Sequence, residues 1–170
     1  MIVVSDTSPL LNLAAVGRAD LLGALYGVVI IPPAVASELD SVPRRFARFA
    51  VAMGTASLDF VRTEPLPANV DAGALLAELA LRVDYGEAEA LALSIARPAD
   101  LFLTDDLPAR RLATARGVRT QGLLGVLLEA KRRRLLSAVA PLLDRLIHEA
   151  AFRVGADLRA RFIESAGEGE

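Results

Sequence analysis

Short apolar runs alternate with helical segments along most of this chain, and this alternation constrains the fold more than any other feature of the sequence. Four of the runs are typical of buried strands, at residues 2–5, 28–31, 58–63 and 100–104, and residues 118–122 form a further short strand or turn. Strands that alternate with helices build an α/β fold around a mostly parallel sheet. We therefore expect one such sheet, with ligand-binding residues at the carboxyl ends of its strands.

Glycine and proline mark the ends of the expected helices. Gly17 separates two short helices, Gly27 ends the second of them, and Gly117 ends a later one. Further helices are expected at 34–40, after residue 41, at 70–82, at 84–96 and at 156–166, with strongly amphipathic helices between residues 122 and 152. The final "GEGE" is expected to fray.

The composition predicts a soluble protein with an apolar surface to cover. Apolar residues make up 54% of the 170 residues and the mean hydropathy is +0.42, which favours a homodimer or another oligomer. No apolar run reaches the roughly 18 to 20 residues that a membrane span needs, and the N-terminus lacks the basic and apolar regions of a signal peptide. The chain has no cysteine, which excludes disulfides and thiolate chemistry. We expect a cytoplasmic protein.

The charge is nearly balanced overall but is clustered locally. A net charge of −2 gives no bulk attraction to nucleic acid. Eighteen of the 19 basic residues are arginines, whose planar guanidinium suits phosphate. A solvated helix face is the structural alternative for each cluster. The clusters are Arg44, Arg45 and Arg48, then Arg110 and Arg111, then Arg132, Arg133 and Arg134.

Acidic residues follow the predicted strands at one edge of the sheet. Asp6 follows the first strand and Glu38 lies on the helix after the second. The helix before the fourth strand carries Glu87 and Glu89, and that strand ends at Asp105 and Asp106. Each has a structural alternative, because Asp6 and Asp106 can cap helices and Glu38 can be a solvated helix residue. Carboxylates grouped at one edge would repel one another without a cation, so the grouping favours a metal site.

Other common site types lack their residues. The turn after the first strand is not glycine-rich, and there is no P-loop. His148 is the single histidine, and it lies in an amphipathic helical stretch. The sequence therefore lacks the side chains for a zinc site and offers only this histidine for a Ser-His-Asp triad. A phosphoaspartate receiver would want a lysine late in the chain, and Lys131 lies in a helix instead. Mg²⁺ and Mn²⁺ need only oxygen ligands.

The residues that carry these features resemble those of PIN-domain proteins, most closely the subgroup related to the toxins of VapBC-type toxin–antitoxin modules. The matching segments are "VVSDTSPLLNLAAVGRADLL", "VIIPPAVASEL", "DYGEAEALALSIA" and "LFLTDDLPARRLATARGVRTQGLLGVLLEAKRRRLL". The resemblance implies a PIN-like nuclease domain over residues 1–155, folded as a three-layer α/β/α sandwich, and a C-terminal helix and tail over residues 156–170. It implies a ribonuclease that uses Mg²⁺ or Mn²⁺ to activate water, an RNA substrate, a small antitoxin partner and a homodimer.

The resemblance also implies the roles of individual side chains. Asp6 matches the first family acid, with Ser8 as a polar helper, and Glu38 matches the second. Glu87 or Glu89 matches the third. Glu87 is favoured because two residues of helix turn Glu89 about 160° away. Asp105 or Asp106 matches the fourth, supported by Thr104, and Asp105 is favoured as the inner ligand. The expected RNA-binding residues are Arg44, Arg45, Arg48, Arg110 and Arg111.

Two departures separate this chain from the toxins it resembles. The third acid is a glutamate where the toxins usually carry an aspartate, and Pro108 stands where they often carry a further acid. Both changes affect metal affinity without removing the acidic cluster. The alternative function is a catalytically silent PIN-like module that binds proteins through the apolar helices over residues 122–148.

Overall fold

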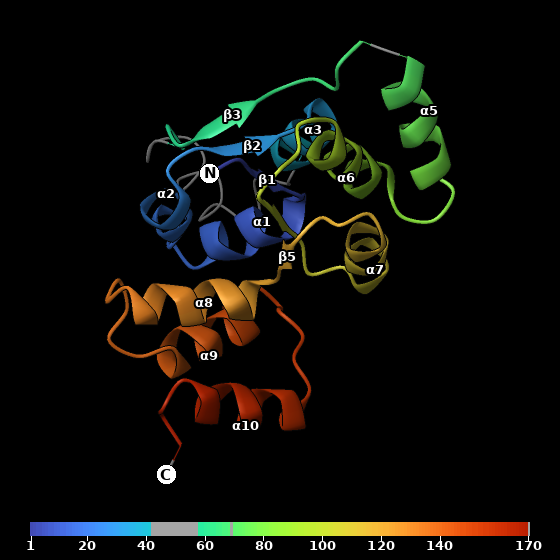
Figure 1. Cartoon of the computed structure of the whole chain (residues 1–170). Coiled ribbons are helices and arrows are strands. Elements are labelled where there is room, and N and C mark those ends of the chain that lie inside the picture. The colour runs from blue at the N-terminus through green and yellow to red at the C-terminus, as the bar shows by residue number, and fades with distance from the viewer. Residues whose placement is uncertain (42–57, 69, 170) are drawn as a thin grey trace.

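The computed structural model describes residues 1–41, 58–68 and 70–169, and within them five parallel strands form one sheet. The strand order is β3-β2-β1-β4-β5 (Figure 1). The α/β fold with a parallel sheet is therefore confirmed, and the segment expected as a short strand or turn supplies the edge strand β5. The strands are β1 (Val3–Ser5), β2 (Val29–Ile31), β3 (Val61–Thr63), β4 (Leu101–Leu103) and β5 (Thr120–Gln121).

Helices flank the sheet and connect its strands. Gly17, with a φ of 67°, separates α1 from α2 as expected, and Gly117, with a φ of 75°, follows α7. The helix expected after residue 41 lies outside the described residues, and so do Arg44, Arg45 and Arg48. The helices are α1 (Thr7–Ala15), α2 (Asp20–Tyr26), α3 (Pro33–Ser41), α5 (Val70–Leu79), α6 (Tyr85–Ala96), α7 (Leu107–Ala115), α8 (Leu123–Arg132), α9 (Ala140–Glu149) and α10 (Ala156–Ser165).

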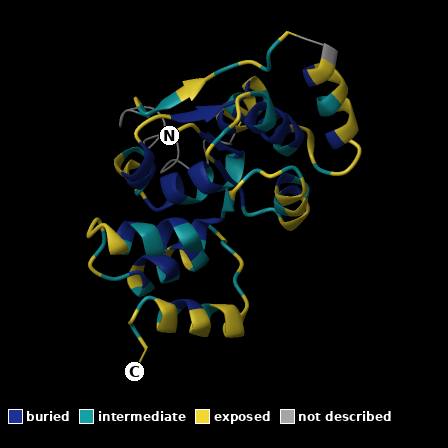
Figure 2. Cartoon of the chain, viewed as in Figure 1, coloured by how far each residue is buried: buried dark blue, intermediate teal, exposed yellow. Residues whose placement is uncertain are grey.

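The central strands are buried along their whole length, which explains their sequences. Every residue of β1, β2 and β4 is buried (Figure 2). A strand covered on both faces has no solvated side, so it appears as a continuous apolar run rather than an alternating one. Helix α6 packs on β1 and on α5 and α7, while α2 packs on α8 and α1 on α9. These contacts hold the carboxyl edge of the sheet between fixed helices.

The strand order creates a switch point between β1 and β4. From β1 the chain moves outward to β2 and β3, then returns across the sheet to β4 and continues to β5. Connections that leave neighbouring strands in opposite directions open a crevice at their carboxyl ends. In the register of these two strands Ser5 pairs with Leu103. Asp6 and Thr104, the residues that follow the two strands, therefore lie side by side at the carboxyl edge of the sheet.

The apolar faces of α8 and α9 pack inside the molecule. Leu123, Val126 and Leu127 of α8 are fully buried, as are Leu143 and Leu146 of α9. The alternative function would use these two helices as a binding surface. Most of their large apolar side chains are instead buried in the core. None of the helices in the described ranges combines the length and the hydropathy that crossing a bilayer requires.

Glu168, near the C-terminus, is held against the helices by several hydrogen bonds. The Glu168 carboxylate accepts hydrogen bonds from the backbone N–H groups of Val139, at 2.7 Å, and Ala140, at 2.9 Å. The ammonium group of Lys131 donates to the same carboxylate, at 2.6 Å, and to the Ala166 carbonyl. Glu168 therefore caps the start of α9 and neutralises Lys131. Local sequence patterns do not reveal such long-range partners.

Replacing Glu168 with alanine is expected to lower the free energy of unfolding by roughly 1 to 3 kcal/mol, since it removes a helix cap and a half-buried charge pair. Urea denaturation measures this change. Glu164→Ala is the matched control, because Glu164 lies one turn away with an exposed side chain. Equal stability of the two variants would show that the tail contacts contribute nothing.

Candidate acid site at the carboxyl edge of the sheet

Asp6 is buried at the carboxyl end of β1 and uses only half of its carboxylate. Its side chain is the N-cap of α1, where Oδ1 accepts a hydrogen bond from the Ser8 backbone N–H at 3.0 Å. Its Oδ2 is buried and has no hydrogen-bond partner. Burial raises the pKa of Asp6 to about 8, a shift that the Thr104 hydroxyl partly opposes and the charges of Asp105 and Glu87 increase. The helix-cap alternative is thus correct but leaves one oxygen unexplained.

Asp105 repeats this arrangement at the end of the neighbouring strand. Its Oδ1 accepts a hydrogen bond from the Leu123 backbone N–H at 2.8 Å, and its Oδ2 is buried without a partner. Burial raises the pKa of Asp105, while the Leu123 N–H and the Arg110 guanidinium partly lower it. A Cβ at Gly122 would lie 2.7 Å from Asp105 Oδ1, so glycine is the residue that allows this close approach. Asp6, which is buried, and Asp105, which is half-buried, therefore each keep one buried oxygen without a hydrogen-bond partner at this edge of the sheet.

Asp106 has a different role from its neighbour. Its Oδ1 accepts a hydrogen bond from the Ala109 N–H at 2.6 Å and so caps α7. Its own backbone N–H donates to Oγ1 of Thr104, a fully buried residue, at 3.1 Å. The adjacent aspartates thus bond to different helices. Asp105 accepts from the start of α8, and Asp106 caps the start of α7.

Glu38 reaches the site from α3 and contacts both α1 and α6. The Thr7 hydroxyl donates a hydrogen bond to Glu38 Oε2. A Cβ at Gly86 would lie 2.2 Å from Glu38 Oε1, so the carboxylate rests directly on the backbone of α6. Neither Thr7 nor Gly86 was predicted to matter. A glycine in the first turn of a helix is the signal that indicates such a close approach.

Glu87 lies in the first turn of α6. Its Oε2 accepts a hydrogen bond from the Asp84 backbone N–H at 3.3 Å. Burial raises the pKa of Glu87 to about 7, and the charges of Asp106, Asp84 and Glu38 raise it further, against the effect of the Asp84 N–H. The pKa of Glu87 therefore depends on acids from three segments. These are Glu38 on α3, Asp84 at the start of α6 and Asp106 at the start of α7.

Glu89, the alternative to Glu87, points to another partner. It is 9% exposed, and its Oε2 accepts a hydrogen bond from the Ala34 N–H in the first turn of α3, at 2.8 Å. This bond joins α6 to the helix that carries Glu38. A carboxylate at a helix N-terminus also meets the positive end of the helix dipole. Glu89 thus links α6 to α3, two of the elements that carry the acids of the site.

The donor set fits a hard divalent cation. The described part of the chain contains no group of three or more acidic or histidine side chains already arranged as metal ligands. The fit rests instead on the unpaired, buried oxygens of Asp6 and Asp105 and on the raised pKa values of Asp6 and Glu87. Buried oxygens without partners are costly. A cation that binds oxygen ligands would satisfy both and relieve the repulsion.

Gly86→Ala is expected to weaken Mn²⁺ binding by about tenfold without lowering stability. The new methyl group displaces the exposed Glu38 carboxylate, whereas alanine favours a helix by up to about 1 kcal/mol over glycine. Isothermal titration with Mn²⁺ measures the affinity. Gly73→Ala, where a Cβ meets nothing within 4 Å, should leave it unchanged. Equal Mn²⁺ affinity for the two variants would show that Glu38 does not contribute to metal binding.

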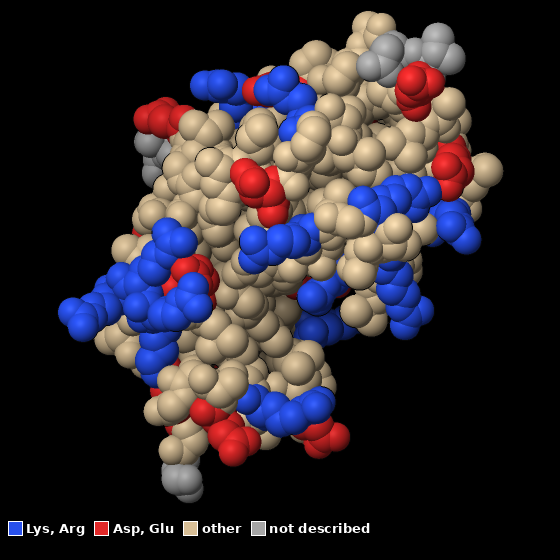
Figure 3. Space-filling view, in the orientation of Figure 1, with Lys and Arg blue, Asp and Glu red and all other residues tan. Residues whose placement is uncertain are grey.

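Basic side chains border the acid site on the α7 side. Figure 3 shows basic side chains around a hollow between α7 and α8. Arg110 and Arg111, both expected to bind RNA, line an open groove along α7. Arg110 also lowers the pKa of Asp105. Its guanidinium group is therefore close enough to stabilise the charge of this carboxylate. A negative ligand on this side would thus meet positive charge beside the carboxylates.

Comparison with known proteins points to one family. A family model described as a PIN domain (DUF3368) matches residues 2–168. The match covers every described strand and all of the acidic residues at the carboxyl edge. A search of curated proteins finds no match.

Proposed function

This chain belongs to the PIN-domain family, and from that membership and the unpaired oxygens of Asp6 and Asp105 we propose that it is a divalent-metal-dependent endoribonuclease. The PIN domain is a nuclease fold, and PIN domains typically bind divalent metals. One observation carries the proposal more than any other. Asp6 and Asp105 leave the switch point of the sheet from adjacent strands, each with one buried oxygen that no hydrogen bond satisfies.

The reaction proposed is hydrolysis of an RNA phosphodiester. Asp6 and Asp105 would hold the cation, with Glu38, Glu87 and Asp106 around them. When bound, a divalent cation polarises a phosphate oxygen and lowers the pKa of an attacking water. Thr104 and the helix N–H groups that bond Asp6 and Asp105 keep both carboxylates oriented.

The proposed substrate contact is through the RNA backbone. Arg110 and Arg111 supply positive charge beside the acids, and Arg44, Arg45 and Arg48 are proposed to add to it. Aromatic residues are 5% of the chain, too few for base stacking to be the main source of affinity. Two further proposals follow from the resemblance to VapBC-type toxins. The chain would act as the toxin of a toxin–antitoxin pair, controlled by a small antitoxin, and it would form a homodimer.

The alternative function, a silent protein-binding module, has less support. It would use the apolar helices α8 and α9, whose large apolar residues are mostly buried within this chain. It also gives no account of the unpaired oxygens of Asp6 and Asp105.

A cleavage assay with one matched pair of variants tests the proposal. End-labelled RNA is incubated with the protein in Mn²⁺, in Mg²⁺ or in EDTA, and fragments are resolved by gel. We expect cleavage with either metal, none in EDTA, and a loss of at least about a hundredfold in Asp105→Asn.

Asp100→Asn is the control for this assay. Asp100 lies at the other end of the same strand, where its carboxylate accepts a hydrogen bond from the Ile2 N–H. The control variant should cleave at the normal rate. Cleavage that persists in EDTA, or that Asp105→Asn does not reduce, would contradict the proposal.

A further inference from the structure

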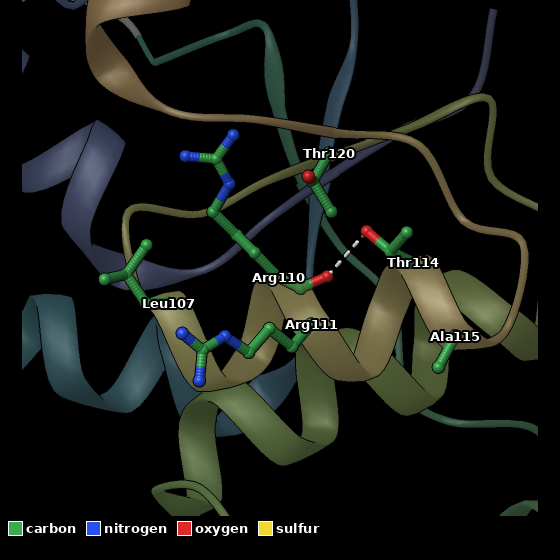
Figure 4. A pocket seen from close by; sticks show the side chains of 6 residues that line it. All are labelled: Leu107, Arg110, Arg111, Thr114, Ala115 and Thr120. Atoms are coloured by element: carbon green, nitrogen blue, oxygen red, sulfur yellow. Dashed lines mark hydrogen bonds between the residues drawn. The ribbon is translucent and has the colours of Figure 1, made fainter.

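The groove along α7 is a second feature beside the acid site. It has a volume of about 450 Å³, which lies in the range of small-molecule binding sites. Figure 4 shows the two guanidinium groups extending from α7 in different directions, with Leu107 and Thr120 also at the groove. The groove is open and has arginine at two of its six lining positions. Its lining residues are Leu107, Arg110, Arg111, Thr114, Ala115 and Thr120.

Neither guanidinium group of the groove forms a salt bridge within the described part of the chain. Many arginines of this protein pair with a carboxylate, for example Arg116 with Glu78 at 2.6 Å and Arg159 with Asp144 at 2.7 Å. Unpaired guanidiniums in a concave site favour a phosphate, which can accept two hydrogen bonds from each of them.

Arg110 also connects the groove to the acid site. A Cβ at Gly122 would lie 3.5 Å from Arg110 Nη1 and 2.7 Å from Asp105 Oδ1. Arg110 Nη1 and Asp105 Oδ1 therefore both lie beside Gly122, which places the guanidinium group next to the acid site. A polynucleotide with one phosphate at Asp105 can place a neighbouring phosphate at Arg110, because both side chains border the same residue.

We infer that this groove is a subsite for the next two RNA phosphates beyond the one that is cleaved, one bound by Arg110 and the other by Arg111 on α7. This inference rests on the proposed ribonuclease function and adds the direction in which the strand leaves the acids, towards α7 and β5. Leu107, which is 62% exposed, gives the sugar an apolar surface. None of the six described lining residues is aromatic, so the subsite is expected to bind the RNA backbone rather than to stack on bases.

The salt dependence of RNA binding tests this inference. A fluorescently labelled ten-nucleotide single-stranded RNA is titrated in Ca²⁺ buffer at several KCl concentrations, and fluorescence anisotropy gives the affinity. Each phosphate contact on a single strand contributes about 0.7 to the slope of log K against log salt. The variant with Arg110→Gln and Arg111→Gln together is expected to lose about 1.4 from this slope and to bind roughly tenfold more weakly.

Two control variants separate a phosphate contact from a general loss of charge or structure. Arg153→Gln with Arg161→Gln removes the same charge from exposed positions in and before α10, and should keep the normal slope. Arg110→Lys with Arg111→Lys keeps the charge and should restore most of the slope. The inference is overturned if the glutamine pair in the groove behaves like the control pair, even when the unmodified protein cleaves RNA. A protein that neither binds nor cleaves RNA would overturn the proposed function as well.

Discussion

Replacing Asp6 with asparagine is expected to lower metal-dependent RNA cleavage by about a thousandfold or more, which corresponds to about 4 kcal/mol. The same change should stabilise the metal-free protein at pH 8 by on the order of 3 kcal/mol, because it removes a buried charge. Asparagine keeps the oxygen that accepts the Ser8 N–H but not the charge on the unpaired oxygen. Loss of activity with a gain of stability is typical of functional residues held under strain.

Two measurements on the same preparation check this pair of effects. Cleavage of labelled RNA in Mg²⁺ gives the activity, and urea denaturation in EDTA at pH 8 gives the free energy of unfolding. Asp20→Asn is the control, since Asp20 is an exposed residue at the start of α2 that pairs with Arg18. It should change neither quantity by much. An Asp6→Asn variant that is both inactive and less stable would make Asp6 a structural cap only.

The stability of the metal-free protein is expected to fall as the pH rises from about 4 to about 8. Burial raises the pKa of Asp6 from 3.8 to about 8 in the folded state. Between these values the folded state holds a proton that the unfolded state has lost. Asp6 alone then lowers the free energy of unfolding by about 1.4 kcal/mol per pH unit, and Glu87, with a pKa of about 7, acts in the same direction.

Adding Mg²⁺ should restore the stability that the metal-free protein loses, and the effect should be largest at high pH. Deprotonated carboxylates bind the cation, so a concentration of 100 times its Kd would stabilise the protein by about 2.7 kcal/mol at pH 8. The effect should be small at pH 5, where Asp6 and Glu87 hold protons. Urea denaturation at pH 5, 6, 7 and 8, with and without Mg²⁺, measures both trends. Stability that rises with pH in EDTA would mean that Asp6 is ionised in the fold throughout this range.

The positions of the strands and helices could be predicted from the sequence because they depend on local signals. The runs at 2–5, 28–31 and 100–104 became β1, β2 and β4, since strands buried on both faces need continuous apolar sequence. The helix ends predicted at Gly17 and Gly117 were also confirmed. Strand order is not local, and the pairing of β1 with β4 across the switch point became visible only in the fold.

The candidate site was predictable in part, for the same reason. Asp6 and Asp105 could be placed by their positions at strand ends, and Asp106 by the helix that follows it. The contact between Glu38 and Gly86 and the hydrogen bond from the Ala34 N–H to Glu89 join segments about 50 residues apart. No periodicity encodes such partners. The roles expected for Arg44, Arg45 and Arg48 remain predictions, because these residues lie outside the described part.

Lys131, which is hydrogen-bonded to Ala166 and Glu168 near the C-terminus, can be labelled selectively. It is the only lysine in the sequence, so an amine-directed reagent has a single side-chain target besides the N-terminus. Its ammonium group is bound to Ala166 and Glu168, and acylation requires that these bonds open first. The rate of labelling at this one residue would therefore report how often the tail detaches, and a partner that displaces the tail would be detected as faster acylation.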